Sequence, residues 1–228
     1  MKVPTPERLA RYIDHTLLKP EATTPQIEQL CAEARDHGFF SVCVNGSRVE
    51  LARHRLADTD AKVACVVGFP LGAMSSDAKR YETEAAIDDG AQEIDLVLNI
   101  GRLKDGDDQY VLRELRDVVE AADERTVKVI IESCLLTEPE KIRACHLICD
   151  SGAHFVKTST GFSAGGATLE DVKLLRQAVG PKFSVKASGG IRDTATALAM
   201  IEAGATRLGT SNGVAIVKGA AEAGSGSY

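Results

Sequence analysis

The sequence has no excess of positive charge. It contains 27 Lys and Arg residues against 33 Asp and Glu residues, which gives a formal net charge of −6 at pH 7. A broad surface for nucleic acid needs clustered Lys and Arg to neutralise the phosphate backbone. The composition therefore argues against a large nucleic-acid interface, although a local basic pocket for a small phosphate is compatible with it.

Long apolar segments are also missing. No run approaches the roughly 20 apolar residues that a membrane-spanning helix requires. The first residues, MKVPTPERLARYIDHT, lack the apolar core of a signal peptide. We therefore expect a cytoplasmic protein that does not bind a membrane.

The cysteines lack the spacing of a metal site or a redox motif. No CxxC occurs, and no Cys/His group has zinc spacing. Cys145, His146 and Cys149 lie close together in a helix-like segment, where free thiols are the simpler explanation. In a reducing compartment no disulfides are needed. We expect no bound metal and six free thiols, at Cys31, Cys43, Cys65, Cys134, Cys145 and Cys149.

The residues that are present predict a globular α/β protein. Hydrophobic residues make up 44% and charged residues 26% of the chain, as in soluble domains. A chain of this length can bury a stable single core. Short apolar runs alternate with segments of helical periodicity. We predict eight strands, near residues 13–18, 40–45, 62–69, 93–99, 126–133, 155–160, 183–188 and 207–211.

Five of the intervening segments have recognisable helix boundaries. They cover residues 24–38, 75–91, 137–153, 168–180 and 193–205. Capping residues at the start and glycines at the end mark these boundaries. The predicted starts are Thr24 followed by Pro25, Ser75 or Ser76, and Thr137, and the predicted ends are Gly38, Gly90 and Gly152.

A repeated Gly-Ala pair predicts how these elements are joined. DDGAQEIDL, DSGAHFVKT and EAGATRLGT each end a helix and begin a strand. Strands that alternate with helices form parallel sheets, and eight such units form a single (β/α)8 TIM barrel. An open doubly wound sheet is the alternative, but no GxGxxG follows the first strand. We predict a barrel domain over residues 1–218 and a flexible tail over residues 219–228.

Three predicted strands carry an ionisable residue among apolar ones. Asp95 lies in EIDLVL, Lys157 in FVKTST and Lys186 in FSVKAS, while Asp14 follows Ile13 in the first strand. Lys is rarely buried without a partner. Because active sites of such barrels lie at the carboxyl ends of the strands, the two lysines would be neighbours facing Asp95.

Such an arrangement suits Schiff-base chemistry. A lysine attacks a carbonyl only as a neutral amine, and burial and a second cation both lower its pKa. Lys186 would be that cation for Lys157, and Asp95 would act as general acid and base, alone or through a water. A structural salt bridge inside the barrel is the alternative explanation for the same residues.

Glycine-rich loops follow the last three predicted strands. Gly161 follows the sixth strand, ASGGIR with Arg192 follows the seventh and GTSNG follows the eighth. Loops after strands seven and eight form the common phosphate site of these barrels, where backbone N–H groups approach the anion. The substrate is therefore expected to be a small phosphorylated carbonyl compound.

The strand residues and glycine-rich loops described above match those of a known family. Over nearly its whole length the sequence resembles the deoxyribose-phosphate aldolases, which are class I aldolases with a (β/α)8 barrel. The combination of KTSTGF and KASGGIR is the most specific part of the resemblance. The matching segments are IDHTLLKP, VCVN, VVGFPLG, EIDLVLNIG, KVIIESCLL, FVKTSTGF, VKASGGIR and RLGTSNGV.

The resemblance implies a reaction and a set of roles. The reaction is the reversible cleavage of 2-deoxy-D-ribose 5-phosphate to D-glyceraldehyde 3-phosphate and acetaldehyde, in deoxyribose and deoxyribonucleotide catabolism, without a cofactor. Lys157 resembles the Schiff-base lysine, Lys186 the second lysine and Asp95 the acid and base. The substrate-binding residues would be Asp14, Thr16, Cys43, Thr158 and Thr160. The phosphate-binding residues would be Gly161, Gly189, Gly190, Arg192, Gly209, Ser211 and Asn212.

Four positions bear on how far the resemblance extends. Some family members have a lysine where this chain has Phe162, so the phosphate would lose one charge. Some carry two serines where this chain has Ser211 and Asn212. The tail ends in Tyr228, which resembles a family tyrosine that reaches the active site, and we weigh a role in proton transfer against a disordered tail.

Two other classes of function remain open from the residues. One is a barrel lyase or isomerase that acts on a sugar phosphate without a Schiff base, a metal-dependent aldolase included. The other is a non-catalytic protein that binds a phosphorylated ligand. The paired lysines and Asp95 favour the aldolase. The family and the modest size also predict a homodimer.

Overall fold

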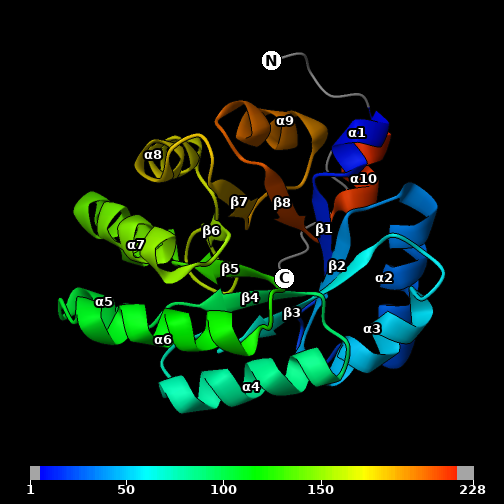
Figure 1. Ribbon diagram of the computed structural model, residues 1–228. Helices are drawn as coiled ribbons and strands as arrows, with labels where there is room; N and C mark the ends of the chain where they lie inside the picture. Colours follow the sequence, from blue (N-terminus) through cyan, green and yellow to red (C-terminus); the bar gives the residue numbers. More distant parts are fainter. Residues whose placement is uncertain (1–5, 220–228) are drawn as a thin grey trace.

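The computed structural model describes residues 6–219 and shows a closed barrel of eight parallel strands (Figure 1). Each strand pairs with its neighbours in sequence, and β8 pairs with β1. The predicted (β/α)8 barrel and all eight of its strands are confirmed. The strands are β1 (Ile13–Thr16), β2 (Ser41–Val44), β3 (Lys62–Val67), β4 (Glu93–Val97), β5 (Thr126–Ile130), β6 (Phe155–Lys157), β7 (Ser184–Ser188) and β8 (Arg207–Thr210).

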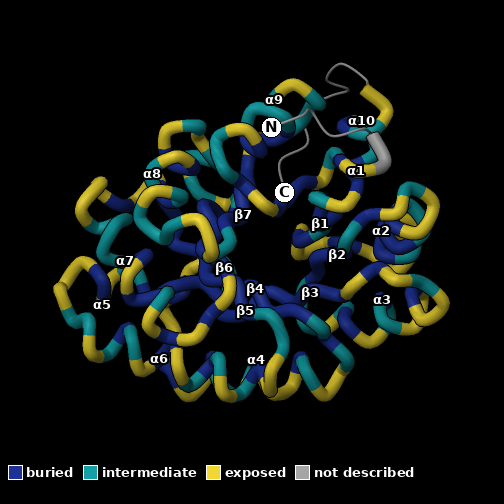
Figure 2. The backbone as a smooth tube through the Cα atoms, turned by 45° about the horizontal axis from the view of Figure 1, so that its top comes forward, coloured by how far each residue is buried: buried dark blue, intermediate teal, exposed yellow. Residues whose placement is uncertain are grey.

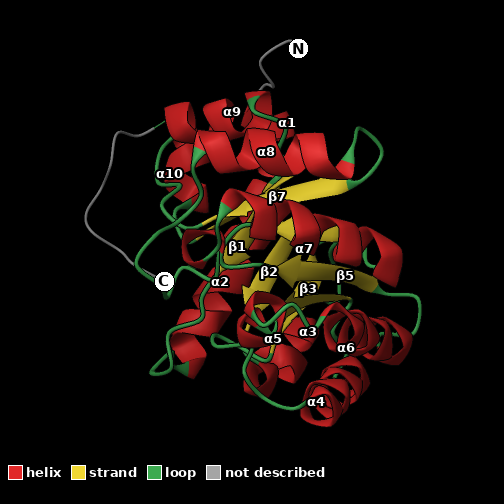
Figure 3. Ribbon diagram, turned by 90° about the vertical axis from the view of Figure 1, so that its left-hand side faces the viewer, coloured by secondary structure: helices red, strands yellow, loops and turns green. Residues whose placement is uncertain are grey.

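Helices surround the barrel and join successive strands (Figure 3). The five helices with predicted boundaries are present, and α1, α3, α5, α6 and α10 complete the ring. The helices are α1 (Pro6–Ala10), α2 (Thr24–His37), α3 (Val49–Arg55), α4 (Ser76–Asp88), α5 (Ile100–Lys104), α6 (Asp108–Ala121), α7 (Glu138–Ser151), α8 (Leu169–Val179), α9 (Thr194–Glu202) and α10 (Gly213–Lys218), with short 3-10 turns η1 (Gly46–Arg48) and η2 (Ser133–Leu135).

Helix capping follows the sequence with one correction. Thr23, not Thr24, caps α2, because its backbone is extended and it forms a capping box with Gln26. Thr137 caps α7 in the same way, with Glu140 as its partner. Ser75 begins α4 by accepting a hydrogen bond from the Ala78 N–H, and α4 ends at Asp88, just before the predicted end at Gly90.

The three Gly-Ala pairs form the same kind of turn. Gly90, Gly152 and Gly204 have φ values of 104°, 88° and 117°, in the region that favours glycine. The alanine after each glycine is buried, and its N–H donates to the end of the preceding helix, to a carbonyl in two of the turns and to the Ser151 hydroxyl in the third. Each pair therefore stops a helix and directs the chain into the next strand of the barrel.

The apolar core lies mainly between the strands and the helices. In Figure 2 the barrel strands are buried and the outer turns of the helices are exposed. Alternate strand residues point outward into this layer, for example Val42, Val63 and Ile94, which belong to one apolar cluster. The inward positions hold a small apolar group of Leu18, Cys43, Ala64 and Val66, and otherwise many charged side chains. The unusual part of this fold is therefore the barrel interior.

Membrane-spanning helices and the C-terminal tail were also addressed by the sequence. Within residues 6–219, no helix is long and apolar enough to cross a membrane. Residues 220–228 of the predicted tail, including Tyr228, lie outside the described residues.

Candidate active site

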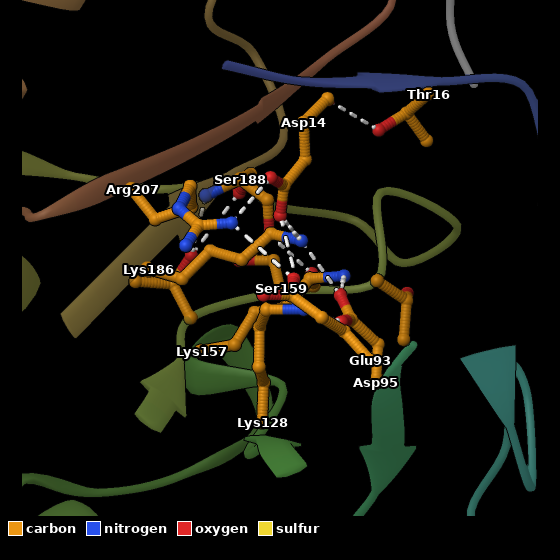
Figure 4. Close-up of polar contacts among 12 residues, drawn as sticks. Asp14, Thr16, Glu93, Asp95, Lys128, Lys157, Ser159, Lys186, Ser188 and Arg207 are labelled. Atoms are coloured by element: carbon orange, nitrogen blue, oxygen red, sulfur yellow. Dashed lines mark hydrogen bonds and ion pairs between the residues drawn. The ribbon is translucent and has the colours of Figure 1, made fainter. Parts of the chain in front are cut away.

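Strand register places the two predicted lysines side by side. Lys157 on β6 and Lys186 on β7 are paired residues of neighbouring strands. Asp95 on β4 faces both, and its Oδ2 lies 2.7 Å from each Nζ (Figure 4). Two ammonium groups this close would repel each other, and the shared carboxylate offsets that repulsion. The geometry predicted from the sequence is thus present.

Burial is the main cause of the change in the proton affinity of Lys157. Its side chain is 3% exposed, and removal from water lowers its pKa below the ordinary value. The Asp95 carboxylate opposes this shift, and Lys186 adds to it. Both causes expected from the sequence are thus present, and burial lowers the pKa of Lys157 more than the second cation does.

Lys186 has the opposite behaviour although it is equally buried. Burial would lower its pKa, but the carboxylates of Asp14 and Asp95 outweigh that effect and raise it. The Lys186 Nζ lies 2.5 Å from Asp14 Oδ2 and 2.7 Å from Asp95 Oδ2. Lys186 is therefore held as an ammonium ion, which makes Lys157 the better candidate nucleophile.

Asp95 is held as a carboxylate. Burial would raise its pKa, but Lys128, Lys157 and Lys186 surround it and lower that pKa well below the ordinary value. The same reasoning applies to Asp14, whose pKa is lowered by Lys186 and Arg207 against the effect of burial. Both groups are therefore ionised at neutral pH, and each could hold a proton only transiently during a transfer.

Three charged residues of this cluster were missed by the sequence analysis. Lys128 on β5 donates to Asp95 Oδ1 at 2.8 Å and lies 2.6 Å from Glu93 Oε2. Arg207 on β8 contacts Asp14 Oδ1 at 2.8 Å and Glu93 Oε2 at 3.3 Å. Strand alternation could have found Glu93, because it lies two residues before Asp95 and so faces the same side.

Arg207 ends this network inside the barrel. Its guanidinium carbon lies 3.4 Å from the centre of the Phe40 ring, a cation–π contact that covers the apolar side of the group. Arg207 is the first residue of β8 and Phe40 immediately precedes β2, so the contact lies at the end of the barrel opposite the predicted active site. The charged network thus runs from Lys157 down to Arg207.

The predicted substrate-binding side chains are either buried or bound within the protein. Thr16 donates to the Asp14 carbonyl, and Thr158 exchanges hydrogen bonds with the backbone of Ser188. Cys43 is fully buried, and burial raises the pKa of its thiol to about 11. Thr160 is bound to the carboxylate of Glu132. Their hydroxyls therefore have partners within the protein.

A cavity of about 230 Å³ lies beside the loops after β6, β7 and β8. Its lining includes six of the seven predicted phosphate-binding residues, together with Ser163, Gly165 and Thr210. Gly209 is placed differently, because it faces the Lys186 side chain inside the barrel, where an added Cβ would lie 3.1 Å from Lys186 Cε. The six are Gly161, Gly189, Gly190, Arg192, Ser211 and Asn212.

Phe162 lies next to this cavity without a charge to offer. Its ring packs edge-on against Phe69, with ring centres 5.2 Å apart, and it is 40% exposed. Arg192 is the cationic side chain in the cavity lining. The glycine-rich loops beside it let backbone N–H groups approach an anion.

Comparison with known proteins shows the family of this chain. The family model of the DeoC/LacD family aldolases matches residues 8–220. The chain belongs to the DeoC/LacD aldolase family. Within that family, the deoxyribose-phosphate aldolase of Alkaliphilus oremlandii is 60% identical over 210 residues, which cover 92% of this chain and 95% of the relative. That of Thermococcus gammatolerans is 58% identical over 219 residues, covering 94% and 97%.

Solved structures of DeoC/LacD relatives have the same fold. A putative deoxyribose-phosphate aldolase from Coccidioides immitis is 42% identical with a TM-score of 0.93, over 96% of this chain and 87% of that chain. The deoxyribose phosphate aldolase from Aeropyrum pernix, described as tetrameric, is 33% identical with a TM-score of 0.88, over 94% and 91% of the two chains.

Proposed function

We propose that this aldolase is a deoxyribose-phosphate aldolase that works through a Schiff base on Lys157. The observation that carries the proposal is the shared Asp95 oxygen, 2.7 Å from both Lys157 Nζ and Lys186 Nζ in a buried site. The site holds one lysine with a lowered pKa beside one with a raised pKa. The relatives named deoxyribose-phosphate aldolase support the choice of substrate.

The first half of the reaction forms the covalent intermediate. Neutral Lys157 attacks the C1 aldehyde of open-chain 2-deoxy-D-ribose 5-phosphate, and the carbinolamine loses water to give an iminium ion. The proton for the departing hydroxide comes from the pool shared by Asp95 and the Lys186 ammonium, directly or through a water. The positive iminium is then the electron sink for bond cleavage.

The second half breaks the carbon–carbon bond. The C3 hydroxyl loses its proton, the C2–C3 bond breaks and D-glyceraldehyde 3-phosphate leaves. The electron pair of the broken bond stays with the two-carbon fragment, which is then bound to Lys157 as the enamine of acetaldehyde. A proton returns to C2, and water hydrolyses the resulting iminium to release acetaldehyde and neutral Lys157. Asp95, which the three lysines hold ionised, would relay the C3 hydroxyl proton toward C2, alone or through a water, because its lowered pKa keeps it from retaining that proton.

The cavity after β6, β7 and β8 is the proposed phosphate site. It opens beside the loops that follow β6 and β7, the two strands that carry Lys157 and Lys186, so a sugar phosphate could reach both places. Arg192 would supply a charge-assisted contact, and the glycine loops would supply backbone N–H groups. A binding protein would not need the buried lysine pair beside this cavity.

Covalent trapping tests the proposal. The protein is incubated with acetaldehyde and sodium borohydride, and its intact mass and peptides are measured. We expect one ethyl group on Lys157 and none when Lys157 is changed to Ala. If the folded protein gives no adduct, the Schiff-base mechanism is wrong, and turnover without an adduct would indicate a lyase of another type. Neither adduct nor turnover would favour the non-catalytic binding protein.

We propose a homodimer in the cytoplasm, with no cofactor. Light scattering during size-exclusion chromatography measures the mass in solution, and a value near twice the 24.3 kDa of the chain is expected. A mass of one or four chains would contradict the dimer without affecting the proposed chemistry.

A further inference from the structure

Glu132 has a backbone conformation that needs an explanation. It follows β5 and has φ 50° and ψ 65°, a left-handed conformation that non-glycine residues seldom adopt. Its side chain is nevertheless buried, with the residue 3% exposed. Such strain persists only where neighbouring structure enforces it.

The neighbouring structure is the loop after β6. The Glu132 carboxylate accepts hydrogen bonds from the Thr160 hydroxyl and, at 3.3 and 3.4 Å, from the Thr160 N–H. The Thr160 Oγ1 in turn accepts from the Phe162 N–H at 3.0 Å. On the other side, the Ser133 N–H donates to the Thr158 carbonyl at 2.8 Å. The turn after β5 therefore holds the start of the β6–α8 loop at several points.

The same loop forms one wall of the proposed phosphate cavity. Gly161, Ser163 and Gly165 line the cavity, and Gly161 has φ 87°. The turn after β5 also packs against the far part of the loop, because a Cβ added to Gly165 would lie 2.9 Å from Cys134 Cβ. The shape of the wall thus depends on the contact between these two turns.

We propose that Glu132 is a positioning residue that sets the preference for a phosphorylated substrate. By binding both the hydroxyl and the N–H of Thr160, its carboxylate fixes the turn through Gly161 whose backbone borders the cavity. Fixed N–H groups bind an anion at lower entropic cost than mobile ones. This inference rests on the proposed aldolase function and assigns Glu132 no contact with the substrate.

A carboxylate is the appropriate group at this position. Its two oxygens accept from two donors at once, whereas the amide of Gln has one accepting oxygen and would turn an N–H toward a donor. Burial raises the pKa of Glu132, and the Thr160 hydrogen bonds and, least, the Lys157 charge oppose that rise. Because that charge reaches Glu132, the competing role is a direct effect on the nucleophile. The experiment must therefore separate the phosphate end of the substrate from the reacting end.

The test compares substrates with and without phosphate. The variant is Glu132→Gln, and the matched control is Glu170→Gln, which changes an exposed acidic residue in the first turn of α8. For Glu132→Gln we expect kcat/KM for 2-deoxyribose 5-phosphate to fall about ten- to hundredfold, the effect of losing a charge-assisted hydrogen bond, mainly through KM. The rate of borohydride trapping with acetaldehyde should stay within about threefold of the wild type, because acetaldehyde carries no phosphate and makes no use of the cavity wall.

Inorganic phosphate gives a second readout. It should inhibit the wild-type enzyme competitively, and its inhibition constant should rise with Glu132→Gln by a factor similar to the loss in kcat/KM. Thr160→Val should produce the same pattern, and the double variant should be little worse than the worse single variant, because both break one contact. With two single variants, Glu132→Gln and Thr160→Val, the test can still be made if one of them folds poorly.

The outcomes separate the two levels of the proposal. An equal loss with acetaldehyde and with the phosphorylated sugar would overturn the positioning role and place Glu132 at Lys157. Unchanged phosphate inhibition in a folded variant would overturn it as well. Failure of the wild-type protein to form an adduct on Lys157 would instead overturn the proposed function itself.

Discussion

Lys157 and Lys186 are two residues of one type that differ in their contacts. Lys157 contacts one carboxylate, Asp95, whereas Lys186 contacts both Asp95 and Asp14. The second carboxylate is sufficient to reverse the effect of burial on the pKa of Lys186. At the scale of single residues, the choice of nucleophile is thus decided by one additional ion pair.

The charge of Lys186 should therefore matter more than its length. With Lys186→Met, Lys157 would lose a neighbouring cation and its pKa would rise, so less neutral amine would exist at a given pH. We expect the acidic limb of the pH profile for acetaldehyde trapping to move upward by about one pH unit, or about tenfold in rate at neutral pH. Trapping rates measured across pH give this shift directly. The control Lys186→Arg keeps the charge, and an equal shift in that variant would contradict the explanation.

Phe162 should limit phosphate affinity. Phe162→Lys would put a cation beside Gly161 and Ser163 of the cavity, and we expect KM for 2-deoxyribose 5-phosphate to fall about three- to tenfold at low salt. Steady-state kinetics at two ionic strengths measure the effect, which should weaken as salt rises. Phe162→Ala removes the contact with Phe69 without adding charge, so a similar gain in that variant would contradict the electrostatic reason.

Among the elements, the loops at the two ends of the barrel have different roles. Loops after the strands border the site, whereas loops before the strands stabilise the barrel. Arg176 on α8 is an example of the second kind. It donates to the Gly204 carbonyl at 2.9 and 3.1 Å and to the carbonyls of Gly180 and Phe183. It therefore ties the turn before β7 to the turn before β8.

Arg176→Met should lower stability without changing catalysis. Three carbonyls would lose a charged donor, and we expect the free energy of unfolding to fall by about 2 kcal/mol and Tm by about 5 °C. Thermal unfolding and kcat/KM at 25 °C measure the two effects separately. Lys173→Met on the same helix changes an exposed side chain and should cost less than about 0.5 kcal/mol. A large loss of activity with Arg176→Met would show that this end of the barrel is coupled to the site.

For the molecule as a whole, the charged interior makes stability depend on pH. Asp14 and Asp95 have folded-state pKa values below the ordinary 3.8, so their stabilisation is present above that value and is lost as the pH falls below it. Lys128 and Lys186 have raised pKa values, so their stabilisation is present below 10.5 and is lost at higher pH. Both contributions are complete at neutral pH.

Acid should therefore unfold the protein through its interior. We expect the free energy of unfolding, measured with urea, to be nearly constant between about pH 5 and 8 and to fall steeply below about pH 4. Asp14→Asn removes one of the responsible carboxylates and should make the fall in stability at acidic pH less steep. It should also lower stability at pH 7, because Lys186 would then contact one carboxylate, Asp95, instead of two. A stability curve that stays flat down to pH 3 would contradict this account.

The sequence by itself determined the parts that depend on local patterns. Alternation of strands with capped helices predicted the barrel, and the matched places of Lys157, Lys186 and Asp95 in their strands predicted the centre of the site, because strand register follows from the repeated unit. The glycine loops predicted most of the cavity lining for the same reason. These features need only the order of residues and the rule that parallel strands end together.

Only the tertiary structure decided what depends on contacts across the barrel. Lys128, Glu93 and Arg207 join the network because closure of the barrel brings β5, β4 and β8 around one interior. Gly209 faces Lys186, Thr158 is bound to Ser188, and Glu132 is bound to Thr160. Hydrogen bonds and ion pairs between residues 28 or more positions apart leave no periodic trace in the sequence. The direction of a pKa shift depends on those same distances, so it too was settled by the folded chain.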